Sequence, residues 1–127
     1  MDEPKRGLQK TYHIIFDVTN ADAKLLSDED FVFHLLIDVP KLVKMKVLSG
    51  PNLVRDYDKS NLGISGFAII SFSHVSIHTF SAKGQALVDI FSCRPFDCEK
   101  VRKYLYGKFN VTSDEVCTLE VKYPWEK

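Results

Sequence analysis

Hydrophobic and polar positions follow strand-like patterns over much of this chain. The first such stretch, residues 11–18 (Thr-Tyr-His-Ile-Ile-Phe-Asp-Val), is rich in the β-branched and aromatic side chains that favour strands. Lys44–Leu48 has a similar pattern, and Ser49-Gly50-Pro51-Asn52 after it contains residues that break strands. The polar stretch Val54–Asn61 predicts a loop. Four further strands are predicted, over Ser65–Phe72, Val75–Phe80, Gln85–Ser92 and Glu115–Tyr123.

Two other stretches carry the signals of helices. Ser27 is followed by three acidic residues, as at a capped helix start, and apolar residues then recur at helical spacing up to Val39. Pro40 predicts the end of this helix or a kink in it. Asp97 predicts the cap of a second helix over Cys98–Phe109. This order of elements predicts an α+β fold, with two helices on one face of a mostly antiparallel sheet.

The composition fits one domain over residues 1–127 and narrows the class of protein. The 17 basic residues balance 17 acidic ones, whereas a nucleic-acid binder normally has a basic excess. No apolar run approaches the roughly 20 residues that span a bilayer, and the charged N-terminus does not resemble a signal peptide. We therefore expect a cytoplasmic protein without a nucleic-acid or membrane partner. The three cysteines have the spacing of neither a disulfide framework nor a zinc site, and no metal is expected.

The densest candidate chemistry lies between Gly63 and Cys93. The apolar run Gly63–Phe72 leads into Ser73-His74-Val75-Ser76-Ile77-His78-Thr79, and Cys93 follows at the end of the next predicted strand. Taken singly, a serine at a turn, a histidine and a cysteine are more often hydrogen-bonding or packing residues. Together and in this order, the stretches resemble the small, prokaryotic-type S-adenosylmethionine decarboxylases. The resemblance is strongest from Gly63 to Cys93 and weaker but continuous on both sides.

The resemblance implies a proenzyme that cuts itself between Phe72 and Ser73. The Ser73 hydroxyl would attack the Phe72 carbonyl, and elimination from the resulting ester would turn Ser73 into a pyruvoyl group, the cofactor. By resemblance Ser65 and His78 assist this self-processing, and a histidine suits a base near neutral pH. Cys93 is then the proton donor in turnover. In that reaction the pyruvoyl group forms a Schiff base with the substrate amine and serves as an electron sink.

Two departures from the family lie next to these motifs. The family usually has glutamate before its cleaved serine, where this chain has Phe72. The family also continues after Ile-His-Thr with Trp-Pro-Glu, where this chain has Phe80-Ser81-Ala82. Phe80 could still stack on adenine, but Ala82 offers no acceptor to ribose hydroxyls, and a missing polar partner discriminates strongly against a substrate.

A third departure is the loop before Gly63, where the family usually has aromatic and histidine residues. Here Tyr57 could replace a stacking ring. Asp56 and Asp58 suit a cationic end of a substrate, or they simply form a solvated acidic loop. S-adenosylmethionine is therefore the default substrate, and L-ornithine or L-arginine, which some relatives decarboxylate, is the alternative.

The resemblance thus predicts a self-processing, pyruvoyl-dependent decarboxylase of polyamine biosynthesis that acts on a small molecule. It also implies a homodimer. A rival from another class is a non-catalytic relative that binds and regulates an active decarboxylase, which Phe72 and the missing glutamate motivate. The presence of all four residues with implied roles in processing or turnover argues against that rival: Ser65, Ser73, His78 and Cys93.

Overall fold

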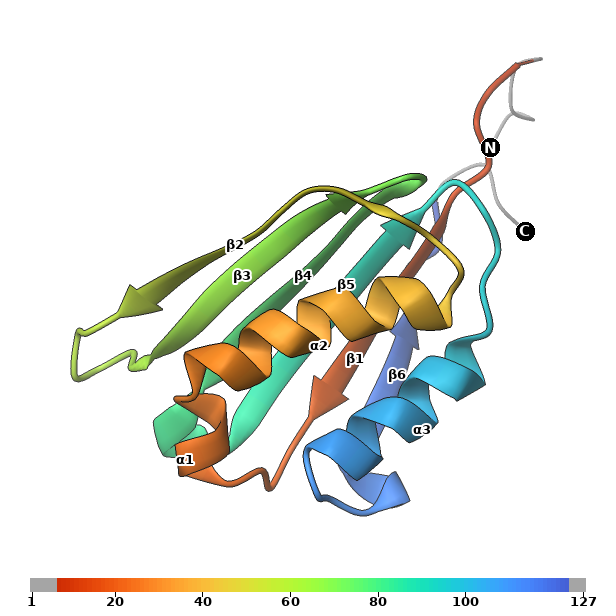
Figure 1. Cartoon of the computed structure of the whole chain (residues 1–127). Helices are drawn as coiled ribbons and strands as arrows, with labels where there is room; N and C mark the ends of the chain where they lie inside the picture. Colours follow the sequence, from red (N-terminus) through yellow and green to blue (C-terminus); the bar gives the residue numbers. More distant parts are fainter. Residues whose placement is uncertain (1–6, 124–127) are drawn as a thin grey trace.

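The computed structural model of this protein describes residues 7–123. Its strands form one sheet in the order β2-β3-β4-β5-β1-β6, and every neighbouring pair is antiparallel (Figure 1). The predicted α+β fold with an antiparallel sheet is therefore confirmed. The strands are β1 (Tyr12–Val18), β2 (Val47–Asp56), β3 (Gly63–Ile70), β4 (Ser73–Phe80), β5 (Gln85–Ser92) and β6 (Val116–Glu120).

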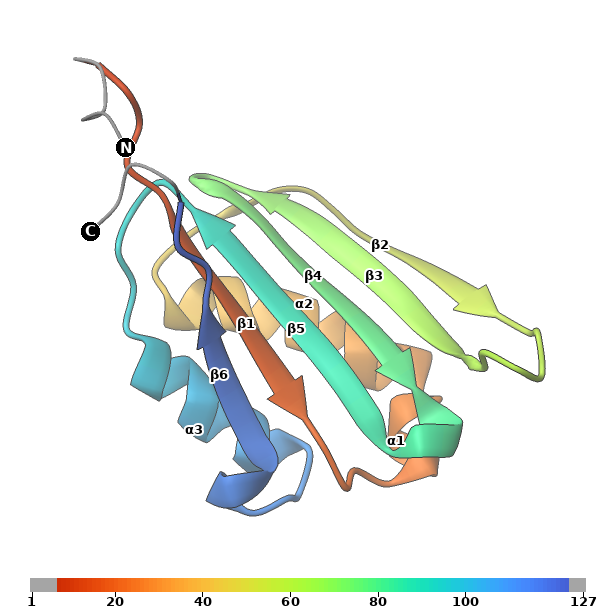
Figure 2. The ribbon, with the colours of Figure 1, turned by 180° about the vertical axis from the view of Figure 1, so that it is seen from behind.

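The α-helices all lie on one face of the sheet. Seen from behind, the sheet has no described helix over it, and we call this side the open face (Figures 1 and 2). The two predicted helices correspond to α2 and α3, while α1 is a short helix that the sequence pattern does not indicate. None of the described helices is long and apolar enough to cross a membrane. The helices are α1 (Ala23–Leu26), α2 (Glu29–Leu42) and α3 (Cys98–Lys108).

The helix ends differ in detail from the predictions. Asp28, rather than Ser27, caps α2, because its carboxylate accepts hydrogen bonds from two N–H groups of the first turn. Pro40 lies inside α2, which continues to Leu42. A proline removes its own N–H from the helix, and here it does so only two residues before the end. Asp97 caps α3, as predicted.

Strand β2 is longer than the sequence pattern predicts. It runs through Ser49–Asn52 with shifts in its pairing to β3, so this segment is an irregularity within the strand and not its end. The proline is tolerated because β2 is an edge strand with a neighbour on one side only. As a result Val54 to Asp56, predicted as loop, belong to β2. The last strand, β6, is shorter than predicted and ends at Glu120.

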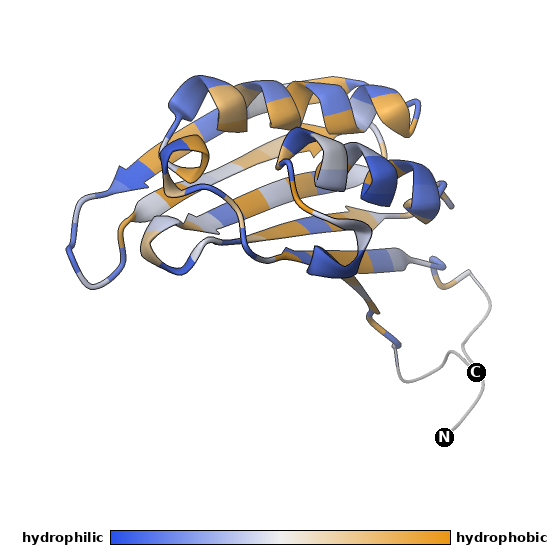
Figure 3. Ribbon diagram, turned by 90° about the horizontal axis from the view of Figure 1, so that it is seen from below, coloured by the Kyte–Doolittle hydropathy of each residue, from blue (hydrophilic) through white to orange (hydrophobic). Residues whose placement is uncertain are grey.

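The hydrophobic core lies between the helices and the covered face of the sheet. Buried and more exposed residues alternate along the strands. The apolar sides of the helices face the sheet (Figure 3). On β5, for example, Ala86, Val88 and Ile90 are buried, whereas the residues between them are only half-buried. Burial of this apolar surface is the main stabilising contribution to the fold. The largest fully buried side chains include Phe16, Phe109, Leu26, Leu35, Leu36, Ile64, Ile77, Ile90 and Leu105.

Two contacts help to seat the helices. The Leu36 side chain of α2 packs over Gly66 of β3, where a Cβ atom would lie 2.9 Å from Cδ1 of Leu36. The hydroxyl of Tyr104 on α3 donates a hydrogen bond of 2.9 Å to Oδ2 of Asp38 on α2. Burial, together with this bond to Asp38, raises the pKa of Tyr104 above its ordinary value.

Candidate active site

The bond between Phe72 and Ser73 lies at the tip of the β3–β4 hairpin. Ile70 pairs with Ser73, so the turn consists of Ser71 and Phe72 alone. Ser73 has a φ of +149°, and a side-chain-bearing residue held at positive φ in this way costs about 1–3 kcal/mol. Such a conformation persists only where the surrounding structure fixes it, which the contacts of the hairpin tip do.

The first set of contacts holds Ser71. Its N–H donates a hydrogen bond of 2.9 Å to the carbonyl oxygen of Lys46, and its Oγ accepts one of 3.0 Å from the Lys46 N–H. Lys46 precedes β2, so this pair ties the tip of the hairpin to the segment between α2 and β2. The turn is therefore fixed on the side of the edge strand.

The second contact holds the carbonyl group at the predicted cleavage point. The carbonyl oxygen of Phe72 accepts a hydrogen bond of 2.9 Å from the backbone N–H of Cys93. Cys93 directly follows β5, whose last residue, Ser92, pairs with Ser73. The register of β4 against β5 therefore brings Cys93 to the Phe72–Ser73 bond. A donor on a carbonyl oxygen is what stabilises the negative charge that develops when the carbonyl carbon is attacked.

Ser65 and His78 form a second group, on the open face. They are directly opposite one another on β3 and β4, and Ser65 Oγ lies 2.7 Å from Nδ1 of His78. Both side chains are exposed. The sequence analysis assigns both residues to self-processing, and that role stays a prediction.

The structure does not bring this pair to Ser73 of the same chain. His78 lies five residues further along β4, which corresponds to about 16 Å at the rise of a β-strand. Phe80, the candidate for stacking on adenine, is seven residues along, or about 23 Å. Within one chain, Ser73 and Cys93 therefore lie at one end of the sheet, and the other candidate residues lie well away from them.

A hollow lies on the open face, and neither Ser73 nor Cys93 lines it. It has a volume of about 480 Å³ and its walls come from β2, β3 and β4. A hollow of this size with mostly apolar walls and a few polar groups is typical of a small-molecule site. The Ser65–His78 pair lies on it, and so does His74, the neighbour of Ser73. The lining residues are Asn52, Val54, Ser65, Gly66, Phe67, Ile69, His74, Ser76 and His78.

The predicted substrate loop consists of the end of β2, at Asp56, and the segment between β2 and β3, at the end of the sheet opposite to Ser73. Tyr57 is 76% exposed. Asp56 accepts hydrogen bonds from the N–H of Asp58 and the side-chain amide of Asn61. Asp58 accepts from the hydroxyl and the N–H of Ser60, and these bonds lower the pKa of Asp58. Both carboxylates are thus already engaged within their own loop, and a role in holding a cationic substrate stays a prediction.

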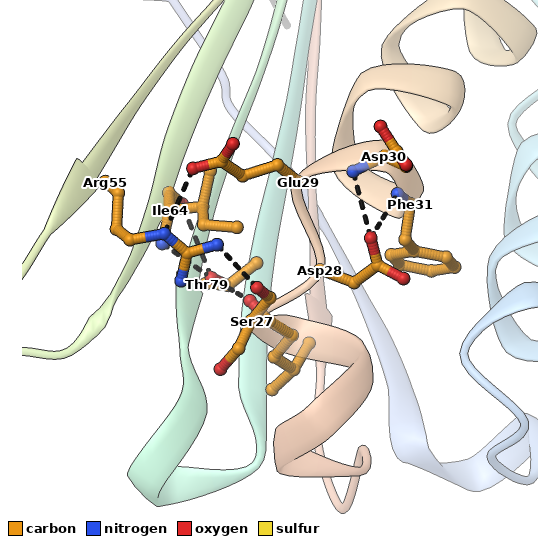
Figure 4. A network of polar contacts seen from close by, with 9 residues as sticks. Ser27, Asp28, Glu29, Asp30, Phe31, Arg55, Ile64 and Thr79 are labelled. Carbon is orange, nitrogen blue, oxygen red and sulfur yellow. Dashed lines mark hydrogen bonds and ion pairs between the residues drawn. The ribbon is translucent and has the colours of Figure 1, made fainter.

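Sequence reasoning missed Thr79, which ties the helical layer to this end of the sheet. Its buried hydroxyl donates a hydrogen bond of 2.8 Å to the Leu26 carbonyl and accepts one of 2.8 Å from the Ile64 N–H (Figure 4). Beside it, Arg55 of β2 donates to Glu29 at 3.0 Å and to the Ser27 carbonyl at 2.6 Å. A threonine in the core-facing row of β4, after the apolar Val75 and Ile77, is the signal that could have identified it.

A row of rings next to the hairpin tip was also missed. His74 stacks on Phe91 with 5.5 Å between ring centroids, and His13 meets the same ring edge-on at 5.3 Å. Nε2 of His13 lies 2.9 Å from Oδ1 of Asp89, and Nδ1 lies 3.1 Å from the Tyr123 hydroxyl. These contacts give His13 and His74 packing partners. Among residues 7–123, no group of three or more His, Cys, Asp or Glu side chains is arranged to hold a metal ion.

Comparisons with known proteins show what the chain is similar to. The S-adenosylmethionine decarboxylase proenzyme of Pyrococcus furiosus is 27% identical over 110 residues, 86% of this chain and 76% of that protein. The proenzyme of Clostridium kluyveri is 31% identical over 108 residues, and that of Clostridium tetani 32% over 111, each covering 82% of both chains. The crystal structure of the adenosylmethionine decarboxylase from Aquifex aeolicus has the same fold, with a TM-score of 0.71 at 22% identity over 87% of this chain and 88% of that one.

The family itself is identified by a match over most of the chain. A model of the S-adenosylmethionine decarboxylase family matches residues 12–120, which span the sheet from β1 to the end of β6. The match includes the hairpin tip, Cys93 and the Ser65–His78 pair. The chain therefore belongs to the S-adenosylmethionine decarboxylase family.

Proposed function

We propose that this chain is a proenzyme that cuts itself between Phe72 and Ser73 and then acts as a pyruvoyl-dependent decarboxylase of S-adenosylmethionine. The observation that carries the proposal is the hydrogen bond from the Cys93 N–H to the Phe72 carbonyl, beside a serine held at positive φ. Membership of the family supports the class of reaction. The naming of the relatives as proenzymes supports self-processing.

Cleavage would begin with attack of Ser73 Oγ on the Phe72 carbonyl carbon. The Cys93 N–H would stabilise the charge on the carbonyl oxygen, and breaking the peptide bond would relieve the conformation of Ser73. The chain would then be joined through an ester between Phe72 and the Ser73 side chain. Removal of the Ser73 α-proton would expel the Phe72 carboxylate, and water would replace the nitrogen, which leaves as ammonia. A ketone remains at position 73.

The surroundings of position 73 fit such a group. Pairing with Ser92 keeps this position at the end of the sheet, and the half-buried Cys93 follows on the neighbouring strand. A pyruvoyl group supplies an electron sink for the charge left on the substrate when carbon dioxide departs. The Cys93 thiol would return a proton to the substrate α-carbon, as a general acid.

Ser65 and His78 would serve Ser73 of a second copy, because about 16 Å of strand separates them from their own. Apolar side chains on the outermost strands and the open face are 40% to 70% exposed. A homodimer that joins two open faces would cover such side chains and would carry the His78 of one copy to the Ser73 of the other. The exposed residues in question are Val54, Phe67, Ile69 and Leu119.

The Ser65 hydroxyl would orient the His78 ring for this work. In the tautomer in which Nδ1–H donates to Ser65 Oγ, Nε2 carries no proton and is able to accept one. That nitrogen would remove the α-proton during elimination, which a histidine does well near neutral pH. The substrate loop and Phe80 of the same copy would also approach the partner's Ser73, because both lie at the end of the sheet opposite to their own Ser73.

Mass analysis of the purified protein tests the proposal. Under denaturing conditions the wild type should separate into residues 1–72 and residues 73–127, and the smaller fragment should react with carbonyl reagents. Ser73→Ala should stay one chain. A wild type that remains uncut after long incubation would exclude the self-processing enzyme and favour the rival function, a non-catalytic partner of an active decarboxylase.

A further inference from the structure

The side chain of Arg94 makes a contact that the proposed reaction does not yet use. Its Cζ atom lies 4.4 Å from the centre of the Phe72 ring, well within the distance of a cation–π interaction. The other cation–ring contacts of the described residues span 5.6 to 6.0 Å. Arg94 is exposed and Phe72 is half-buried. The guanidinium therefore covers the residue whose carbonyl group would be attacked.

The backbone of Arg94 is held in place for this contact. Its N–H donates a hydrogen bond of 2.9 Å to Ser92 Oγ, and the Ser92 hydroxyl donates one of 2.8 Å to the Arg94 carbonyl. Ser92 is fully buried and pairs with Ser73 across the β4–β5 ladder. The guanidinium thus projects from the same fixed segment that supplies the Cys93 N–H.

We propose that Arg94 is a positioning residue for chain cleavage. By holding the Phe72 ring, it keeps the Phe72 carbonyl on the Cys93 N–H while the Ser73 hydroxyl attacks. In that step the bond from Ser73 Oγ to the Phe72 carbonyl carbon forms and the Phe72–Ser73 peptide bond breaks. The hydroxyl proton ends on the freed Ser73 amine. The inference rests on the proposed function.

This role also accounts for the aromatic residue at position 72. The family usually has glutamate there, and a carboxylate and a ring both attract a guanidinium. An aromatic side chain at the cleavage point is therefore compatible with cutting in this chain, because Arg94 offers it a partner.

The first test follows cleavage with time after a short pulse of cell-free synthesis, read on denaturing gels. We expect Arg94→Met, which keeps length but loses charge, to cut about two- to fivefold more slowly, the range that follows from an exposed cation–π contact. Arg94→Lys should restore most of the rate. Lys108→Met is the matched control, because Lys108 lies 5.8 Å from the Tyr104 ring on α3, away from the hairpin. All three variants should melt at the wild-type temperature.

The second test asks whether the charge acts through the ring. In a Phe72→Leu background, Arg94→Met should cause no further loss of rate. In a Phe72→Glu background it should again slow cleavage, because an ion pair is lost. A wild-type cleavage rate in Arg94→Met, or the same loss of rate with and without the Phe72 ring, would overturn the role of Arg94 but not the proposed function. A wild type that never cuts would overturn the proposed function and this role together.

Discussion

The backbone N–H of Cys93 lies 2.9 Å from the carbonyl oxygen of Phe72. The donor belongs to the main chain, so it is present whatever side chain stands at position 93. The thiol, in contrast, is available for a different task. One residue thus offers two groups, and the proposed function gives the first to self-cleavage and the second to turnover of the substrate.

Cys93→Ala separates these two groups. We expect this variant to cut within about threefold of the wild-type rate, because the N–H remains, but to release carbon dioxide about 10²- to 10⁴-fold more slowly, because a general acid is lost. Mass analysis measures the cutting, and labelled substrate measures the release. Cys117→Ala, at an exposed position of β6, is the control and should be normal in both. If Cys93→Ala stays uncut, the thiol itself takes part in cleavage.

His78→Ala tests whether the active site is shared between two copies. Alone, this variant should cut slowly, because the base is missing, and hydroxylamine should release fragments if it stalls at the ester. Ser73→Ala alone should not cut. Co-expressed with a tagged Ser73→Ala chain, the His78→Ala chain should cut again, because its Ser73 receives the intact His78 of the other copy.

The identity of the cut chain decides this experiment. Fragments should come only from the His78→Ala chain, whose different tag identifies them by mass. Rapid cutting of His78→Ala by itself would remove His78 from self-processing. Failure of the mixture to cut, with mixed dimers demonstrated, would argue that Ser65 and His78 act within their own chain.

Local chemistry explains which features could be predicted. The strand over Gln85–Ser92 follows from a mainly apolar run after a turn at Gly84, and the Asp97 cap follows from a short side chain before a helix, so both are local signals. The length of β2 could not be predicted from local signals, because the pairing of β2 with β3 outweighs the Gly-Pro signal at Ser49–Asn52. The spacing of Ser65, Ser73, His78 and Cys93 likewise identifies residues but not distances, since five residues along a strand extend about 16 Å.

Thr79→Val should weaken the attachment of the helices to the sheet. The substitution keeps the shape of the side chain but removes the hydroxyl that joins the Leu26 carbonyl to the Ile64 N–H. Loss of a partner by a buried polar group costs about 1–3 kcal/mol, and we expect the free energy of unfolding in urea to fall by that amount. Thr79→Ser, which retains the hydroxyl, should lose much less. A Thr79→Val protein as stable as the wild type would show that these groups find other partners.

Ala82 should limit the use of S-adenosylmethionine. It is exposed, so a longer side chain would fit, and it lacks the acceptor that the family's glutamate offers to ribose. Ala82→Glu should therefore raise the release of carbon dioxide from S-adenosylmethionine. Lys83→Gln, its exposed neighbour with the same change in charge, should not.

The acidic loop should matter only if the substrate is a basic amino acid. Asp56→Asn and Asp58→Asn should leave turnover of S-adenosylmethionine unchanged, because both carboxylates bind within their own loop. Turnover of L-ornithine or L-arginine that disappears in these variants would instead support the alternative substrate class. Turnover of an amino acid that survives both changes would require another anchor.

Tyr104 should make the fold sensitive to alkali. Burial and the bond to Asp38 raise the pKa of Tyr104 in the folded state. The protonated phenol therefore stabilises the fold at a pH below 10.0, the ordinary pKa of tyrosine, and this contribution is lost as the pH rises further. The difference in free energy of unfolding between the wild type and Tyr104→Phe should therefore narrow above pH 10. Denaturation at a series of pH values measures it. A constant difference would show that the phenol ionises equally in both states.

The order of the strands determines what a cut at the hairpin tip would produce. Strands β1 to β3 would belong to one fragment and β4 to β6 to the other, yet β1 lies between β5 and β6, and β3 lies beside β4. Backbone hydrogen bonds would therefore join the two fragments through three strand pairs, β3–β4, β1–β5 and β1–β6. The mature protein would consist of two peptides that share one sheet. Dilution would not separate them unless the protein unfolded. Its halves, made separately, would each lack the neighbours that complete their sheet.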